Sequence, residues 1–119
     1  MGWLSKLFGS KNNAPKHPPE HEVVIDFFYG STHYQHVYAL EDLIRHAIID
    51  AAVGKYDGHD IAEDGGDISL YMYGPDAEAL YRAISPVLAE SQILRGATVT
   101  LWYGPPKRGT QKRIIQLPS

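Results

Sequence analysis

The alternation of apolar and polar residues along the chain predicts a mixed α+β domain. Residues 22–30 (EVVIDFFYG) are rich in β-branched and aromatic residues and end on glycine, which is typical of a strand. Apolar residues on both of its faces indicate a central place in a sheet. The next segment has the spacing of an amphipathic helix that stops at Gly54. Its apolar side is expected to hold Leu40, Leu43, Ile44, Ala47, Ile48 and Ala51, and its outer side Glu41, Asp42, Arg45, His46 and Asp50.

The second half of the chain repeats this order. Residues 55–62 and 67–74 flank the turn sequence EDGG and predict a hairpin. Pro75 and Asp76 then open a second helix. Because its apolar stripe continues past Pro86, we expect that helix to be kinked or broken near Ser85. Residues 98–104 alternate as a strand, and residues 113–117 predict a short final one.

These elements predict a ferredoxin-like fold of order β-α-β-β-α-β, with an antiparallel sheet, two helices on one face and a short extra C-terminal strand. Tyr29-Gly30 and Tyr73-Gly74 stand at corresponding places in the two halves, each between a strand and a helix. We therefore expect those two strands to lie parallel at the centre of the sheet. Residues 22–119 form the single domain, behind a separate segment of residues 1–21.

That N-terminal segment combines a short amphipathic stretch with a linker. Trp3, Leu4, Leu7 and Phe8 recur at helical spacing around Lys6, and residues 11–20 are rich in Pro, Asn and Lys. The stretch is too short for a secretory signal and lacks a cleavage site. It suits weak contact with an anionic membrane or docking in a partner's groove. The alternative is a frayed tail or a flap on the protein's own surface.

Two motifs carry a resemblance to a known group of proteins. Residues 56–61 (YDGHDI) and 70–77 (LYMYGPDA), followed by Leu80 and residues 86–88 (PVL), resemble an uncharacterised family of small bacterial α+β proteins. The resemblance covers residues 22–104. It implies a ferredoxin-like fold and a bacterial origin, and it brings no known activity or catalytic residue with it.

Composition narrows the functional classes. The 119 residues include no cysteine, which removes disulfides, thiolate nucleophiles and zinc–thiolate sites, and fits a cytoplasmic protein. A formal charge of −3 provides no general attraction for nucleic acid. We expect no cofactor and no nucleic-acid partner. The N-terminal segment would bring such a protein to the inner face of the membrane.

Two sets of polar residues offer candidate chemistry. His33, His36, Asp57 and His59, with Asp60 nearby, would serve a small metal-dependent or acid/base enzyme if they converged. Their spacing is a weak signal, and we favour solvent-facing or capping histidines and no metal site. The second set is basic and surrounds the turn before the last strand, where it would hold a phosphate or an acidic patch. It consists of Lys107, Arg108, Lys112 and Arg113.

An aromatic set carries the favoured functional prediction. Tyr71, Tyr73 and Trp102, joined by Phe28, alternate with the apolar residues expected under the helices, so they would line the open side of the sheet. Exposed Tyr and Trp are typical of protein interfaces. We therefore predict a non-catalytic module that binds a protein partner or a second copy of itself. The enzyme and the peripheral membrane module stay as alternatives.

Overall fold

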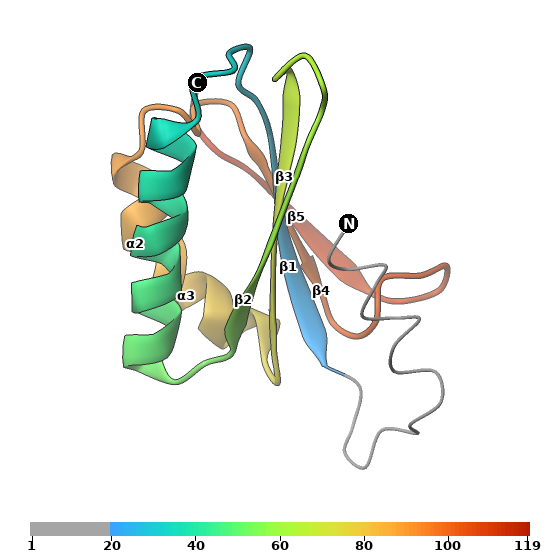
Figure 1. Ribbon diagram of the computed structural model, residues 1–119. Helices are drawn as coiled ribbons and strands as arrows, with labels where there is room; N and C mark the ends of the chain where they lie inside the picture. Colours follow the sequence, from blue (N-terminus) through green and yellow to red (C-terminus); the bar gives the residue numbers. More distant parts are fainter. Residues whose placement is uncertain (1–19) are drawn as a thin grey trace, which may run out of the picture.

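The computed structural model describes residues 20–119, and these form an α+β domain with two helices and one five-stranded antiparallel sheet, as the sequence predicted (Figure 1). The elements match the expected order with the additional strand at the end. In chain order they are β1 (His21–Phe28), α2 (Gln35–Ala51), β2 (Lys55–Ile61), β3 (Asp67–Gly74), α3 (Ala77–Glu90), β4 (Thr98–Trp102) and β5 (Lys112–Gln116).

The strands are ordered β2-β3-β1-β4-β5, and every neighbouring pair is antiparallel. The expectation that β1 and β3 run parallel is therefore wrong, although both are central. The reason is topological. From β1 the chain passes through α2 to β2, which lies at the edge of the sheet with room for one strand between it and β1. The tight β2–β3 turn then places β3 in that position, running in the opposite direction. The two strands that α2 connects, β1 and β2, do run parallel, but β3 lies between them.

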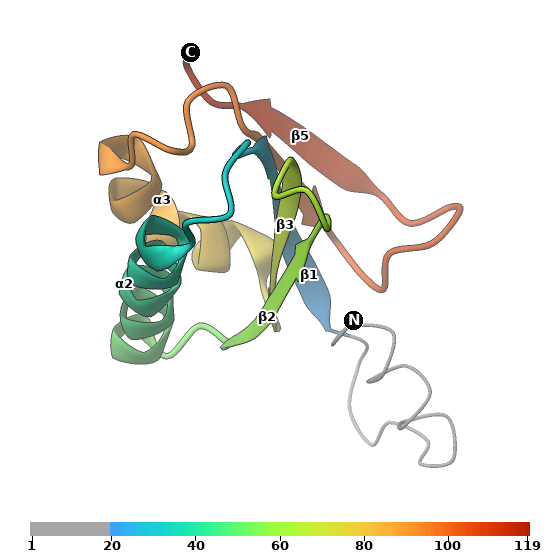
Figure 2. The ribbon, with the colours of Figure 1, turned by 45° about the horizontal axis from the view of Figure 1, so that its top comes forward.

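Both helices cover the same face of the sheet, and the core lies between the two layers (Figure 2). Alternation along β3 places Ile68, Leu70 and Met72 in this core, each almost completely buried. β1 contributes Val23, Ile25 and Phe27 in the same way. Within residues 20–119 no helix has the length and apolar character needed to cross a membrane.

Helix α2 begins earlier than expected, at Gln35, and its buried stripe is centred differently. Val37, Leu40, Ile44 and Ile48 face the sheet, whereas Leu43 is 58% exposed. Glu41, expected on the outer side, is only 6% exposed. Starting the stripe at Val37 turns the helix so that position 41 points inward and position 43 outward.

Helix α3 is not broken at Pro86. Asp76 caps its N-terminus by accepting hydrogen bonds from the backbone N–H groups of Glu78 and Ala79. Proline cannot donate to the carbonyl four residues earlier, which belongs to Arg82. The Ser85 hydroxyl donates to that carbonyl instead, at 3.3 Å. This side chain supplies the hydrogen bond that Pro86 removes, and the helix continues to Glu90.

A close backbone approach joins the α2–β2 connection to the end of β3. A side chain at Gly54 (φ +153°) would overlap the carbonyl oxygen of Tyr73, and one at Gly74 would overlap the carbonyl oxygen of Val53. Gly54 therefore requires glycine for both space and backbone conformation, and Gly74 requires it for space. The contact holds the start of edge strand β2 against β3.

Replacing Gly54 by alanine should test this approach, with Gly58→Ala as the matched control. Gly58 has a similar φ of +147° but no atom within 4 Å of an added methyl group. We expect Gly58→Ala to cost roughly 1–3 kcal/mol from backbone strain alone. Gly54→Ala should cost at least about 2 kcal/mol more, because the backbone must also move. Equal losses in urea unfolding would contradict the close-approach account.

Candidate functional site

The candidate site is the sheet face opposite the helices, called here the open face. Cross-strand partners project to the same side of a sheet, so the register arranges these residues in rows that run across the strands. Within residues 20–119 both helices lie on the other side (Figures 1 and 2). The first row is Lys55, Tyr73, Glu22, Trp102 and Lys112; the second is Tyr71, Val24, Thr100 and Ile114; the third is Asp60, Ser69, Asp26, Thr98 and Gln116.

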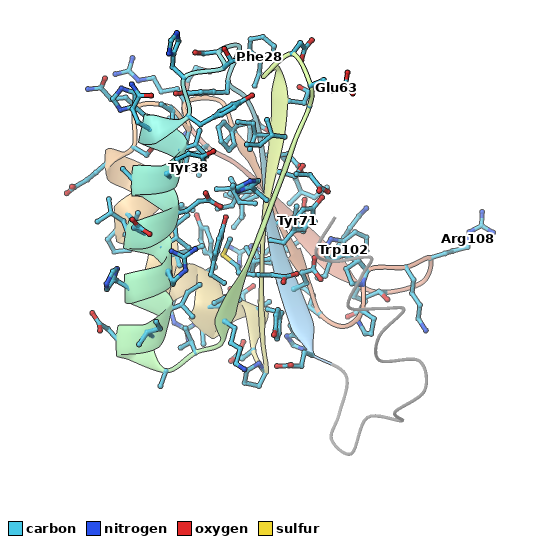
Figure 3. The ribbon with its side chains drawn as sticks, viewed as in Figure 1. Phe28, Tyr38, Glu63, Tyr71, Trp102 and Arg108 are labelled. Atoms are coloured by element: carbon cyan, nitrogen blue, oxygen red, sulfur yellow. The ribbon has the colours of Figure 1, made fainter. Side chains whose placement is uncertain are left out.

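Three of the four predicted aromatic residues lie in the first two rows. Tyr73 and Trp102 flank Glu22 on either side, and Tyr71 is in the next row on β3. Phe28 also projects from the open face, but it pairs with Asp67 at the far end of β1. Phe28 lies six positions along β1 from Glu22, a distance of about 20 Å, and it is 73% exposed. Figure 3 shows Phe28 at one end of the molecule and Tyr71 and Trp102 near the middle.

Local contacts hold several side chains of this face in place. Tyr71 donates its hydroxyl hydrogen to Asp60 Oδ2 at 3.0 Å, and Ser69 donates to Asp26 Oδ1 at 2.5 Å. The Lys112 ammonium lies 4.8 Å from the centre of the Trp102 ring, a cation–π contact. Burial, followed by the hydrogen bond to Asp60, raises the pKa of Tyr71 to about 12. The hydrogen bond to Asp60 orients the Tyr71 hydroxyl as a donor.

Carboxylates are the part of this face that the sequence reasoning missed. Glu22 lies between the two aromatic residues of the first row and is only 6% exposed. Asp26 and Asp60 lie in the third row, and Asp67 lies beyond it beside Phe28. The signal was present in residues 22–28, where Glu22, Asp26 and Phe28 alternate with the buried Val23, Ile25 and Phe27. The open face thus has its aromatic residues in the first two rows, with Lys55 and Lys112 at the ends of the first, and it has Asp26 and Asp60 in the third.

The histidines of the alternative enzyme do not assemble into one site. Glu41 Oε2 lies 2.7 Å from His59 Nδ1, where it accepts a hydrogen bond from the ring N–H, and the His59 ring stacks on Tyr38. His33 lies in the loop after β1, and His36 lies in the first turn of α2. Across residues 20–119 no three His, Cys, Asp or Glu side chains come together as a metal-binding group. Asp57 and Asp60 belong to β2, with Asp60 bonded to Tyr71.

Glu41 is the unexpected residue of that region. Its Oε2 atom, which contacts His59, also accepts a hydrogen bond from the Tyr56 hydroxyl at 2.5 Å. Burial and this hydrogen bond raise the pKa of Tyr56 well above its usual range. The Arg45 guanidinium lies 5.1 Å from the Tyr56 ring centre. The cluster fastens α2 to edge strand β2 through polar contacts.

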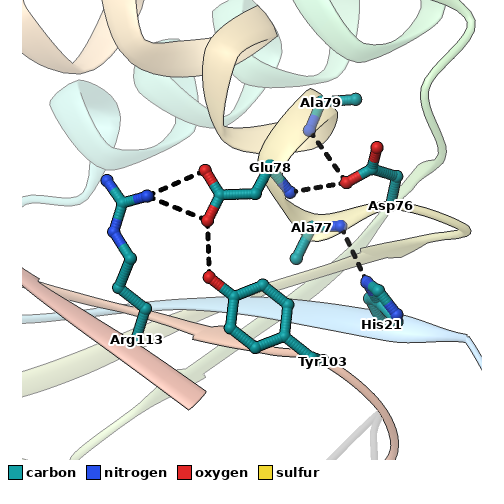
Figure 4. A network of polar contacts seen from close by, with 7 residues as sticks. All are labelled: His21, Asp76, Ala77, Glu78, Ala79, Tyr103 and Arg113. Atoms are coloured by element: carbon teal, nitrogen blue, oxygen red, sulfur yellow. Dashed lines mark hydrogen bonds and ion pairs between the residues drawn. The ribbon is translucent and has the colours of Figure 1, made fainter. Parts of the chain in front are cut away.

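The four predicted anion-binding residues point to different surroundings. Arg113 donates to both carboxylate oxygens of Glu78, at 2.8 and 2.9 Å, and the Tyr103 hydroxyl donates to the same carboxylate at 2.5 Å (Figure 4). Lys112 lies on the opposite side of the sheet against Trp102. Lys107 and Arg108 are exposed on the β4–β5 loop, and Figure 3 shows Arg108 extending away from the domain.

The network in Figure 4 also fixes the start of α3. The backbone N–H of Ala77 donates to His21 Nδ1 at 3.0 Å, and the His21 ring packs edge-on against Tyr103. With the Glu78 contacts, these bonds connect β1, α3, β4 and β5 at one end of the domain. Arg113 therefore has a structural role in this network.

The predicted docking residues Trp3, Leu4, Leu7 and Phe8 lie outside the described residues. Comparison of the chain with protein-family models, with curated proteins and with solved structures finds no match. The functional argument therefore starts from the chemistry of the open face.

The Tyr71–Asp60 pair should be visible in an alkaline titration. The absorbance difference between the wild-type chain and Tyr71→Phe should show a phenol with a pKa of about 12. Asp60→Asn should lower that pKa, whereas Asp50→Asn on the outer side of α2 should not. Because the folded-state pKa lies above the ordinary value of 10.0, the stability from this group is present below pH 10 and is lost between about 10 and 12. A Tyr71 pKa near 10 would refute the contact.

The Glu78 network should show the opposite dependence on pH. Hydrogen bonds from Tyr103 and the nearby Arg113 hold the pKa of Glu78 below its usual 4.5. Its stabilisation is therefore complete above that value and is lost as the pH falls through the lowered pKa. We expect Glu78→Gln to destabilise the protein in urea at pH 7 and to have a much smaller effect near pH 3. Glu63→Gln, which removes a carboxylate from an exposed turn, is the control; equal pH profiles would contradict the network.

Proposed function

We propose that this chain is a non-catalytic protein-binding module that uses the open face of its sheet. The observation that carries the proposal is the placement of Tyr71, Tyr73 and Trp102 on β3 and β4 beside central β1, on the side away from both helices. Tyrosine and tryptophan contribute large apolar area and a polar group with little loss of conformational freedom, and they are enriched where proteins bind each other.

The charge of this face favours a protein over a nucleic acid. An exposed sheet with aromatic residues also suits the stacking of RNA bases. Phosphates would, however, meet Asp26, Asp60 and Asp67, with Lys55 and Lys112 as the cations of the face. Carboxylates repel the phosphate backbone that supplies most of nucleic-acid affinity. A partner with apolar and basic groups fits this surface better.

The topology supports the same interpretation. We propose a ferredoxin-like domain in which the strand order β2-β3-β1-β4 is extended by β5. The added strand widens the open face and contributes Ile114, which is 58% exposed. A second copy of the chain and a different protein are both partners that such a face suits.

Site-specific photo-crosslinking in cells would test this function. A photoreactive amino acid placed at Ile114 reports on the open face, and the same residue at Leu43 reports on the helix layer. The two side chains are equally exposed, at 58%, which makes them matched positions. We expect at least about a fivefold excess of intermolecular protein adducts from position 114. Adduct formation that is equal at the two positions, or greater at 43, would exclude the open face as the binding surface.

A further inference from the structure

We propose that the open face binds the cationic, aromatic N-terminal segment of its own chain, residues 1–19, which then competes with external partners. This inference rests on the proposed function, because it concerns regulation of the same surface. Three arguments support it: the distribution of charge, the reach of the chain and the match of apolar side chains.

Charge is divided unevenly between the two parts of the chain. Residues 1–19 contain Lys6, Lys11 and Lys16 and no Asp or Glu. The remaining eight of the eleven basic residues therefore share residues 20–119 with all fourteen acidic ones, a formal charge of −6. Within the domain, the third row of the open face has Asp26 and Asp60 and no basic residue. A segment of charge +3 is attracted to this surface at moderate ionic strength.

The chain leaves the domain beside the proposed binding surface. Glu20 precedes His21, the first residue of β1, and Glu22 belongs to the first row of the open face. Glu20 lies twelve positions after Phe8, enough to span about 40 Å when the chain is extended. Five strands at about 4.8 Å and three rows at about 6.8 Å make the face roughly 24 by 20 Å. The segment can therefore reach every row without leaving its own molecule.

The apolar content of the segment suits the aromatic part of the face. Trp3, Leu4, Leu7 and Phe8 supply side chains that pack well on Tyr71 and Trp102. A tethered segment also has an effective concentration in the millimolar range. The segment would then be bound to the open face for much of the time, even if its affinity were too weak for a stable complex between separate molecules. An external partner must displace it, so the segment sets a threshold for binding.

An apolar groove between α2 and α3 is the competing location. It is lined by Leu40, Leu43, Val87 and Ile93 together with His36 and Glu90. The groove lies on the helix layer, near the end of α3 that is furthest from His21. Fourteen helical residues, about 20 Å, separate the two ends of that helix. The groove therefore lies further from Glu20 than the open face does. Its lining includes one carboxylate, that of Glu90.

Disulfide trapping can locate the segment, because the chain has no natural cysteine. The test compares Ser5→Cys/Ile114→Cys with Ser5→Cys/Leu43→Cys in the full chain, equilibrated in glutathione redox buffers. Position 114 reports the open face and position 43 the groove, at equal natural exposure. We expect an effective concentration at least about tenfold higher for the 5–114 pair. Non-reducing gels separate disulfides within one chain from those between copies.

Charge variants test whether the acidic side chains hold the segment. Asp26→Asn/Asp60→Asn, added to the 5–114 pair, should lower its effective concentration at least about threefold. Asp42→Asn/Asp50→Asn removes the same charge from exposed positions of α2 and should not. Circular dichroism confirms that each variant is folded. The proposal is overturned by an effective concentration for the 5–43 pair that equals or exceeds that of the 5–114 pair, by mainly intermolecular disulfides, or by equal effects of the two charge variants.

The photo-crosslinking experiment separates this inference from the function on which it rests. Trp3→Ser/Phe8→Ser should increase intermolecular adducts from position 114 at least about threefold by freeing the open face. Unchanged adducts would overturn the inference and leave the binding surface intact. The 5–114 disulfide could form as expected while neither the wild-type segment nor Trp3→Ser/Phe8→Ser gives intermolecular adducts from position 114. In that case the segment occupies the open face and the proposed function is wrong.

Discussion

The alternation of side chains along β1 is the constraint on which the rest of the structure depends. This strand pairs with β3 on one side and β4 on the other, so its register sets both neighbours. Val23 and Ile25 enter the core, while Glu22 and Asp26 face the opposite way. A slip of one residue would place two carboxylates against the helices, which is strongly unfavourable without compensating partners. Backbone bonds from Tyr29 to Gly66 and from Gly30 to Gly65 hold one end of this register.

Much of the fold could be predicted because local patterns and tertiary packing agree. The residues of β3 alternate without exception between core and open face, and strand length and turn chemistry gave its bounds. Prediction failed where two arrangements of the same residues satisfied the local pattern equally well. In α2, a stripe through Leu43 and one through Val37 both have helical spacing, and only packing against the sheet selects the second. The burial of Glu41 depends on Tyr56 and His59, which are 15 and 18 residues away.

The candidate site was predicted in part for the same reason. Alternation was enough to place Tyr71, Tyr73 and Trp102 together, because strand period and face are directly related. It could not show that Phe28 lies several residues further along, since that depends on the pairing register. Nor could the charge pattern of residues 107–113 show that Arg113 pairs with Glu78, which lies 35 residues earlier. Cross-strand and helix–strand partners are long-range information that a single sequence leaves open.

The two outermost strands have a consequence for solubility. A sheet edge presents backbone donors and acceptors that can recruit a strand from another molecule, the first step of aggregation. Among residues 20–119 these edges are β2 and β5. β2 has a bulge between Tyr56 and Gly58, and β5 begins with Lys112 and Arg113. The bulge in β2 and the charged residues of β5 disfavour the addition of a strand from another molecule. The protein can therefore present an aromatic face without polymerising through its edge strands.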